Sequence, residues 1–189
     1  MAEVLYYNPI DLDKYDKFKK IAEEKGIDII DVGKDNLDEK IGYLLGISGF
    51  DDSHEPRIEE DCDLDFDFVL FNGFDNQELF DFLDELRNNG ASVQHKAGIT
   101  ANNVKWTLRE LLIENDKEAK TMGLVHKINQ LIDKAEGLKS LNGEDRKVQM
   151  IIDEILAYFN DSSIFEIEIA KKHYLSLLDE VLRFEKEHQ

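Results

Sequence analysis

Six residues in the first half of the chain have side chains or backbone properties suited to holding a small polar ligand. They are Asn8, Asn72, Gly73, Lys96, Thr100 and Asn103. Asparagine amides both donate and accept hydrogen bonds, so they suit a neutral polar group. A lysine beside the start of a helix can hold an anion together with the helix amides. These residues predict a site for a small molecule or anion. No G-x-S-x-G or H-E-x-x-H motif accompanies them, so we assign no catalytic residue.

The elements that must position these residues recur at an offset of 64 residues. The segment Val4–Asn8 lines up with Phe68–Asn72, and Gly26 lines up with Gly90. Each copy has the pattern strand, helix, strand, helix, which favours parallel pairing and right-handed crossovers. The predicted fold class is α/β. Its four-stranded, mostly parallel sheet has the order 2-1-3-4 and comes from two βαβα repeats.

The first and third strands are central neighbours in this predicted sheet. Open parallel sheets bind ligands in the crevice at the carboxyl ends of such strands. We therefore expect Asn8 and Asn72 to face each other there, with Gly73 allowing a close approach of the backbone. The alternative is that each asparagine only closes a turn after its strand.

The segment Lys96–Thr100 leads from the fourth strand into a predicted helix that ends near Asn115. Thr100 is its expected N-cap, and with Lys96 it forms a candidate anion site. Alternatively, Thr100 only caps the helix and Lys96 only faces water. Trp106 and Ile113 lie away from the side of this helix that faces the sheet. They predict a second packing surface, covered by the C-terminal helices, a second copy of the chain or a partner protein.

Apolar spacing changes after residue 116. From Leu124 onward, apolar residues follow heptad-like steps of three and four, interrupted at Asn142-Gly143. Ser163 and Glu166 form a predicted capping box. The expected organisation is an α/β domain over 1–116, with copies at 1–46 and 66–116 and an acidic loop at 47–65. An all-helical segment follows over 117–189, as a bundle or hairpin that closes on itself or on a second chain.

The net charge of −19 argues against nucleic acid as a partner, since phosphate contacts need clustered lysines and arginines. Residues 1–116 hold 28 acidic and 12 basic residues. The run 51–67 holds nine acidic residues beside Arg57. Taken as a calcium loop from Asp61, it has Phe66 where glycine is needed and Asn72 where glutamate is needed. His54 and Cys62 have no fixed metal-ligand spacing, so we expect no metal and no cofactor.

The expected location is the cytoplasm. No apolar run reaches the roughly 18 residues of a membrane span. The first residues, Met1-Ala2-Glu3, lack the basic and apolar regions of a secretion signal. A single cysteine, Cys62, suits a reducing compartment.

A combination of motifs between residues 66 and 116 resembles an uncharacterised bacterial family, domain of unknown function 3783. The motifs are Phe71-Asn72-Gly73-Phe74, Leu83, Leu86, Gly90, Lys96-Ala97-Gly98-Ile99-Thr100, Asn103, Trp106-Thr107-Leu108 and Glu110-Leu111-Leu112. The resemblance implies a bacterial cytosolic protein. It marks Lys96, Thr100, Asn103 and Trp106 as part of the family pattern, and it implies no activity, substrate or cofactor.

Two functions remain open from the sequence. The first is a non-enzymatic binding or regulatory module whose helical segment mediates self-association or partner docking. The alternative is a small-molecule or anion-binding enzyme or sensor that uses the crevice at the carboxyl ends of strands 1 and 3.

Overall fold

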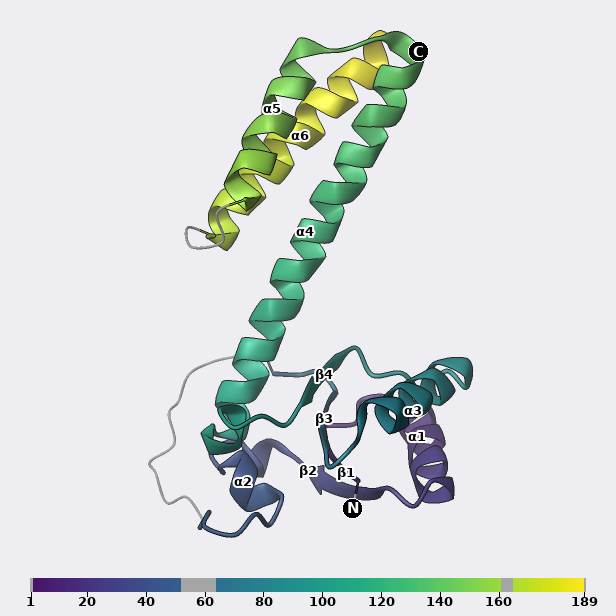
Figure 1. Cartoon of the computed structure of the whole chain (residues 1–189), viewed down its shortest axis with the longest axis vertical. Coiled ribbons are helices and arrows are strands. Elements are labelled where there is room, and N and C mark those ends of the chain that lie inside the picture. Colours follow the sequence, from purple (N-terminus) through teal and green to yellow (C-terminus); the bar gives the residue numbers. More distant parts are fainter. Residues whose placement is uncertain (1, 52–63, 161–164, 189) are drawn as a thin grey trace. The chain divides into compact units, whose positions relative to one another are not determined.

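The structure is a computed structural model that describes residues 2–51, 64–160 and 165–188 (Figure 1). The chain divides into two compact units, Met1–Lys117 and Glu118–Gln189. We describe each unit by itself.

A mixed four-stranded sheet forms the centre of the first unit. Its strands are β1 (Glu3–Tyr7), β2 (Asp28–Val32), β3 (Phe68–Asn72) and β4 (His95–Gly98). The spatial order β2-β1-β3-β4 confirms the predicted order. β1 pairs in parallel with β2, and β3 pairs in parallel with β4.

The central pair, β1 and β3, is antiparallel. Glu3 lies opposite Asn72, and Tyr7 lies opposite Phe68. The carboxyl ends of β1 and β3 are therefore at opposite ends of the sheet, and the expected crevice between them is wrong. The physical reason is that a crossover helix fixes the direction of the strand that it returns to. Each crossover acts within its own half, and none connects β1 to β3 directly.

Two helices, α1 (Leu12–Glu24) and α3 (Asn76–Asn88), cover one face of the sheet (Figure 1). Alternate strand residues point to this face because strand side chains have a period of two. The sheet contributes Val4, Tyr6, Val69 and Phe71 to this core cluster. Gly26 and Gly90 follow the two helices with φ of 66° and 67°. This left-handed conformation at a helix end favours glycine. The 64-residue repeat itself stays a prediction.

The opposite face is covered by α2 (Ile41–Leu44) and by the first turns of α4 (Leu108–Asn142). The second helix of the first copy is only four residues long. The chain forms a 3-10 turn, η1 (Lys34–Asn36), before α2 begins. The unit therefore has three layers, with helices on both faces of the sheet.

The start of α4 corrects the helix expected from Thr100. A 3-10 turn, η2 (Asn103–Lys105), follows β4, and α4 begins only at Leu108. The backbone N–H of Thr107 donates to Glu110 Oε2 at 2.8 Å, and the N–H of Glu110 donates to Thr107 Oγ1 at 3.2 Å. This capping box sets the helix start. The expected end near Asn115 is also wrong, because α4 continues to Asn142.

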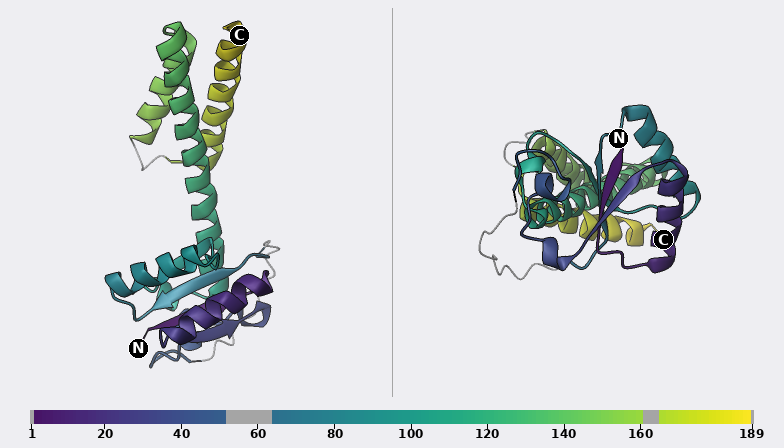
Figure 2. Two further views of the ribbon diagram at one scale, coloured as in Figure 1. Left: turned by 90° about the vertical axis from the view of Figure 1, so that its right-hand side faces the viewer. Right: turned by 90° about the horizontal axis from the view of Figure 1, so that it is seen from below.

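Among the described residues of the second unit, three helices pack together (Figure 2). The C-terminal part of α4 lies alongside α5 (Arg146–Phe159) and α6 (Ile167–Glu187). The buried side chains follow the predicted heptad-like spacing. They are Ile128, Ala135, Val148, Ile152, Ile155, Ala170, Leu177, Val181 and Phe184. The N-cap of α6 is Glu166, and Ser163 lies outside the described residues.

Candidate functional site

Asn8 has the conformation of a turn residue. Its φ is 49°, and its backbone N–H donates to Val32 O at 3.2 Å. Its amide nitrogen lies 3.5 Å from both Asp65 Oδ1 and Phe66 O, at the limit of a hydrogen bond. Asparagine tolerates the left-handed region better than other residues with a Cβ. These contacts support the alternative in which Asn8 closes the turn after β1.

Asn72 lies at the other end of the sheet, beside the first residue of β1. Its amide nitrogen donates to Glu3 Oε1 at 2.6 Å. Gly73 follows with φ of 75°, and Asp75 then caps α3. The structure therefore does not bring Asn8 and Asn72 together. Their amides serve two separate turns.

Thr100 and Asn103 brace the turn that follows β4. Asn103 Oδ1 accepts from the Thr100 N–H at 2.7 Å, and the Asn103 N–H donates to Thr100 Oγ1 at 3.0 Å. The Asn103 amide nitrogen also donates to Gly98 O at 2.9 Å. Asn103 is the one polar residue that is buried among the described residues. Polar groups that satisfy one another's hydrogen bonds in this way are typical of a structural turn.

Lys96 is held by its own loop. Its ammonium donates to Val93 O at 3.0 Å and to Gln94 O at 3.3 Å. Since no α-helix starts at Thr100, the expected combination of Lys96 with a helix N-terminus is wrong. Asn115, which the sequence marked only as the expected end of a helix, fixes this strand. Its amide nitrogen donates to Lys96 O at 3.1 Å, and its Oδ1 lies 3.2 Å from His95 Nδ1.

Trp106 and Ile113 are half-buried against the core cluster that covers the second face of the sheet. Trp106 precedes α4 in extended conformation, and its carbonyl accepts from the Ile41 N–H at 2.9 Å. Both side chains therefore have apolar neighbours within the first unit. An additional interface at these residues stays a prediction.

Within residues 2–51, 64–160 and 165–188, no group of three or more His, Cys, Asp or Glu side chains could hold a metal ion. None of the helices there combines the length and apolar character needed to cross a membrane. His54, Cys62, Asp61 and most of the acidic run 51–67 lie outside the described residues.

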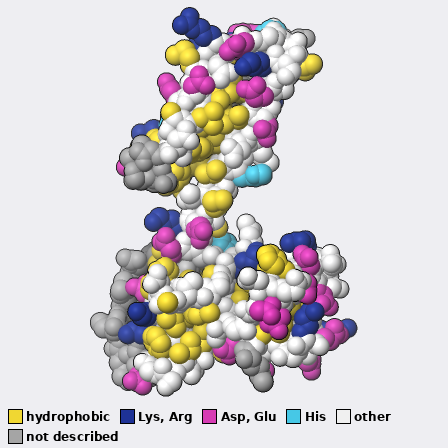
Figure 3. All heavy atoms as spheres, in the orientation of Figure 1, with side chains coloured by type: hydrophobic (Ala, Val, Ile, Leu, Met, Phe, Trp, Pro, Cys, Tyr) yellow, Lys and Arg dark blue, Asp and Glu magenta, His cyan; other side chains and the backbone are white. Residues whose placement is uncertain are grey.

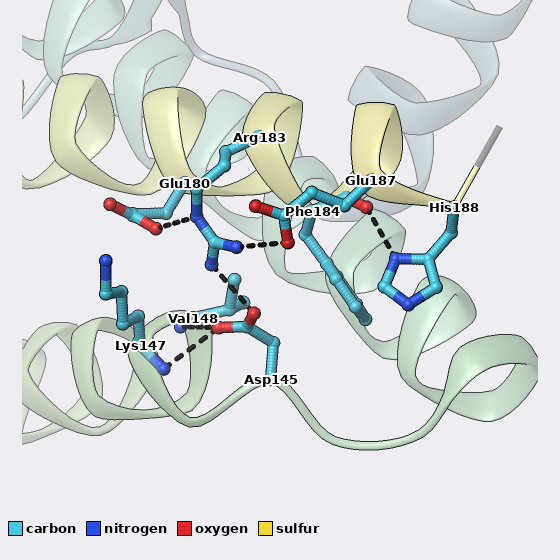
Figure 4. A network of polar contacts seen from close by, with 8 residues as sticks. All are labelled: Asp145, Lys147, Val148, Glu180, Arg183, Phe184, Glu187 and His188. Carbon is cyan, nitrogen blue, oxygen red and sulfur yellow. Dashed lines mark hydrogen bonds and ion pairs between the residues drawn. The ribbon is translucent and has the colours of Figure 1, made fainter.

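A network of charges joins two helices of the second unit (Figure 4). Arg183 on α6 donates to Asp145 Oδ2 at 2.7 Å, to Glu180 at 2.6 Å and to Glu187 at 2.7 Å. Asp145 is also the N-cap of α5, where it accepts from the Val148 N–H at 3.1 Å. The hydrogen bond from Arg183 is the main cause that lowers the pKa of Asp145 from its ordinary value.

A stripe of leucines on α6 faces water. Leu175 is 56% exposed and Leu182 is 41% exposed, and the half-buried Leu178 lies between them. Lys171 and Glu185 continue the same spacing at its two ends, since all five residues follow steps of three and four. We call this set the α6 stripe. Within the chain, Lys171 pairs with Glu168 at 2.6 Å, and Glu185 pairs with Lys134 at 2.7 Å. Hydrophobic side chains also gather in a band on the face of the helical unit that Figure 3 presents.

Comparison with known proteins finds a match for one segment of the chain only. No curated protein and no solved structure matches the chain. A family match covers β3, α3, β4 and the beginning of α4, and it includes Lys96, Thr100, Asn103 and Trp106. Residues 67–122 match the model described as Domain of unknown function (DUF3783), so this segment of the chain is similar to that family.

Proposed function

We propose that the chain is a non-enzymatic binding module whose helical unit joins two copies of the chain through the α6 stripe. The observation that carries the proposal is the exposure of Leu175 and Leu182 on a helix that already buries another side. Core packing explains Ala170, Leu177 and Val181, but it does not explain the leucines of the stripe.

The spacing of the stripe favours a helix as its partner. Leu175, Leu178 and Leu182 follow steps of three and four, as in helices that pack at shallow angles. Burying an exposed leucine side chain contributes about 1.5–3 kcal/mol. Several leucines from each of two copies therefore offer a useful driving force for association.

The charges at the ends of the stripe favour a second copy in antiparallel orientation. A parallel pair would place Lys171 near Lys171 and Glu185 near Glu185, which is unfavourable. An antiparallel pair places the lysine end of one stripe beside the glutamate end of the other. Such a two-fold contact uses the same surface on both copies, as in most homodimers.

Sedimentation velocity over a range of concentrations tests this proposal. We expect a dimer whose dissociation constant rises at least tenfold when Leu175→Ser and Leu182→Ser are combined. The matched control combines Leu12→Ser and Leu141→Ser, two leucines that are 65% and 82% exposed outside the stripe. A wild-type monomer at all concentrations, or an equal effect of both variants, would contradict the proposal.

Charge reversal tests the antiparallel orientation. Lys171→Glu and Glu185→Lys should each weaken the dimer, because each brings like charges together at both ends of the interface. The double variant should restore it, since the lysine and glutamate ends are only exchanged. Dimerisation through another surface predicts no such restoration.

A further inference from the structure

A cavity of about 110 Å³ lies between α3 and the edge strand β4, within the segment that matches the family. Apolar side chains line it together with Ser92 and two cations, Arg87 and Lys96. We infer that this cavity binds a short aliphatic carboxylate, with the carboxylate between the two cations and the aliphatic tail inside. The inference does not depend on the α6 stripe.

The register of the sheet explains why a cavity exists here. In one half of the sheet, Val4 pairs with Ile29, which packs against the core cluster under α1 and α3. In the other half, Val69 pairs with Lys96. An isoleucine covers the apolar core at the first edge. At the second edge the lysine carries its ammonium to Val93 O and Gln94 O, so the apolar wall stays open beside it.

The ammonium of Lys96 is positioned before any ligand arrives. A lysine has three N–H donors, and two backbone carbonyls occupy two of them. Among the described residues, no carboxylate forms an ion pair with Lys96. Arg87 uses one of its five donors on Asp84 at 2.8 Å. Both cations therefore have donors left for an anion.

Cavity size limits the tail of the ligand. An apolar cavity of about 150 Å³ holds one benzene molecule. The smaller cavity here suits a tail of roughly three or four carbons on that scale. Its lining includes the apolar side chains of Val69, Phe71, Leu86 and Val93, and Ser92 adds one hydroxyl group. Shape and charge together favour a carboxylate with a tail of this length. Acetate has only a methyl group as its tail, and an alcohol lacks the charge.

Lys96 has a competing role that needs no ligand. Charged side chains that point inward from an edge strand prevent a sheet from pairing with other chains. β4 is an edge strand, and Lys96 on it pairs with the buried Val69 but is itself exposed. The two roles differ in one measurable respect, because only a binding site distinguishes butyrate from its two matched controls.

The experiment is a titration of the full-length ¹⁵N-labelled protein with sodium butyrate, followed by NMR. Sodium acetate and 1-butanol serve as matched ligands, with sodium chloride holding the ionic strength constant. We expect butyrate to shift the amide signals of Arg87, Val93 and Lys96. Its dissociation constant should be at least tenfold lower than those of acetate and 1-butanol.

Two substitutions at position 96 distinguish the effect of the lysine charge from the effect of the cavity volume. Lys96→Gln removes the charge and should raise the dissociation constant of butyrate at least tenfold. Lys96→Ile imitates Ile29 and should abolish binding while it raises the melting temperature. Lys105→Gln, at an exposed lysine outside the cavity lining, should bind butyrate like the wild type. The inference is overturned if butyrate binds no better than acetate or 1-butanol, or if Lys96→Gln binds it like the wild type.

Discussion

Arg183 donates to Asp145 at 2.7 Å and so ties the last turns of α6 to the start of α5. The same carboxylate caps α5 through the Lys147 and Val148 N–H groups. Because the pKa of Asp145 is lowered in the folded protein, its contribution to stability is present above its unfolded pKa of about 3.9. This contribution is lost as pH falls through the lowered folded pKa. We expect the free energy of unfolding, measured with urea, to fall in this acid range.

Asp145→Asn is the matched control for this acid dependence. Asparagine is as good an N-cap as aspartate, but it has no charge to lose. The variant should be less stable than the wild type at neutral pH and should lose less stability on acidification. Asp145→Ala should lose about 1 kcal/mol more, because it also removes the cap. An unchanged acid profile in Asp145→Asn would show that another carboxylate is responsible.

The buried hydroxyls of Tyr6 and Tyr15 lead us to expect a loss of stability at alkaline pH as well. Burial is the main cause that raises the pKa of both hydroxyls, and Asp67 and Asp31 raise them further. Their neutral forms are favoured by folding, so this contribution is complete below the unfolded pKa of about 10 and declines above it. Following tyrosinate absorbance and circular dichroism together should show these two residues ionising only as the protein unfolds. Tyr15→Phe should flatten the alkaline decline, and a decline identical to that of the wild type would contradict the assignment.

The backbone conformation of Asn8 predicts that glycine is a better replacement for it than alanine. Its φ of 49° lies in the left-handed region, which costs an alanine roughly 1–2 kcal/mol. We expect Asn8→Ala to destabilise the protein by about 1 kcal/mol and Asn8→Gly to change its stability little. Urea unfolding measures both. Equal effects of the two variants would mean that the side-chain contacts matter more than the backbone conformation.

Asn103 is predicted to be the least replaceable polar side chain of the first unit. Asn103→Ala leaves the Thr100 N–H and the Gly98 carbonyl without their partner, which costs about 1–3 kcal/mol for a buried group. Asn102→Ala is the matched control, because Asn102 is exposed and makes no capping bond. Thermal or urea unfolding should separate the two variants clearly. If they are equally stable, the turn after β4 does not depend on the amide.

The sequence patterns predict the strand order and the helices of the first unit because they record which side of each element is buried. They do not record the relative direction of β1 and β3, since an apolar strand fits the sheet centre in either direction. The helix start near Thr100 was wrong for a local reason. Thr100 and Thr107 both precede apolar residues, but Glu110 lies three residues after Thr107 and completes its capping box.

Of the residues that line the cavity between α3 and β4, the sequence pointed only to Lys96 as a candidate site residue, and it did not point to Arg87. Lys96 stands out in the sequence as a cation beside a turn. The cavity next to it depends on the register that sets Lys96 beside Val69, and on the position of α3 above both. Register and helix placement are tertiary properties, so spacing along the chain does not reveal them.

β2 and β4 lie at opposite edges of the sheet, with β1 and β3 between them. Ile29 pairs with Val4 and Lys96 pairs with Val69, so these two edge residues have no common strand neighbour. A substitution at position 96 can therefore change the chemistry of one edge while the strand pairing of the other edge stays the same. Protein engineers could use the same independence to graft a different specificity at β4 without redesigning the rest of the sheet.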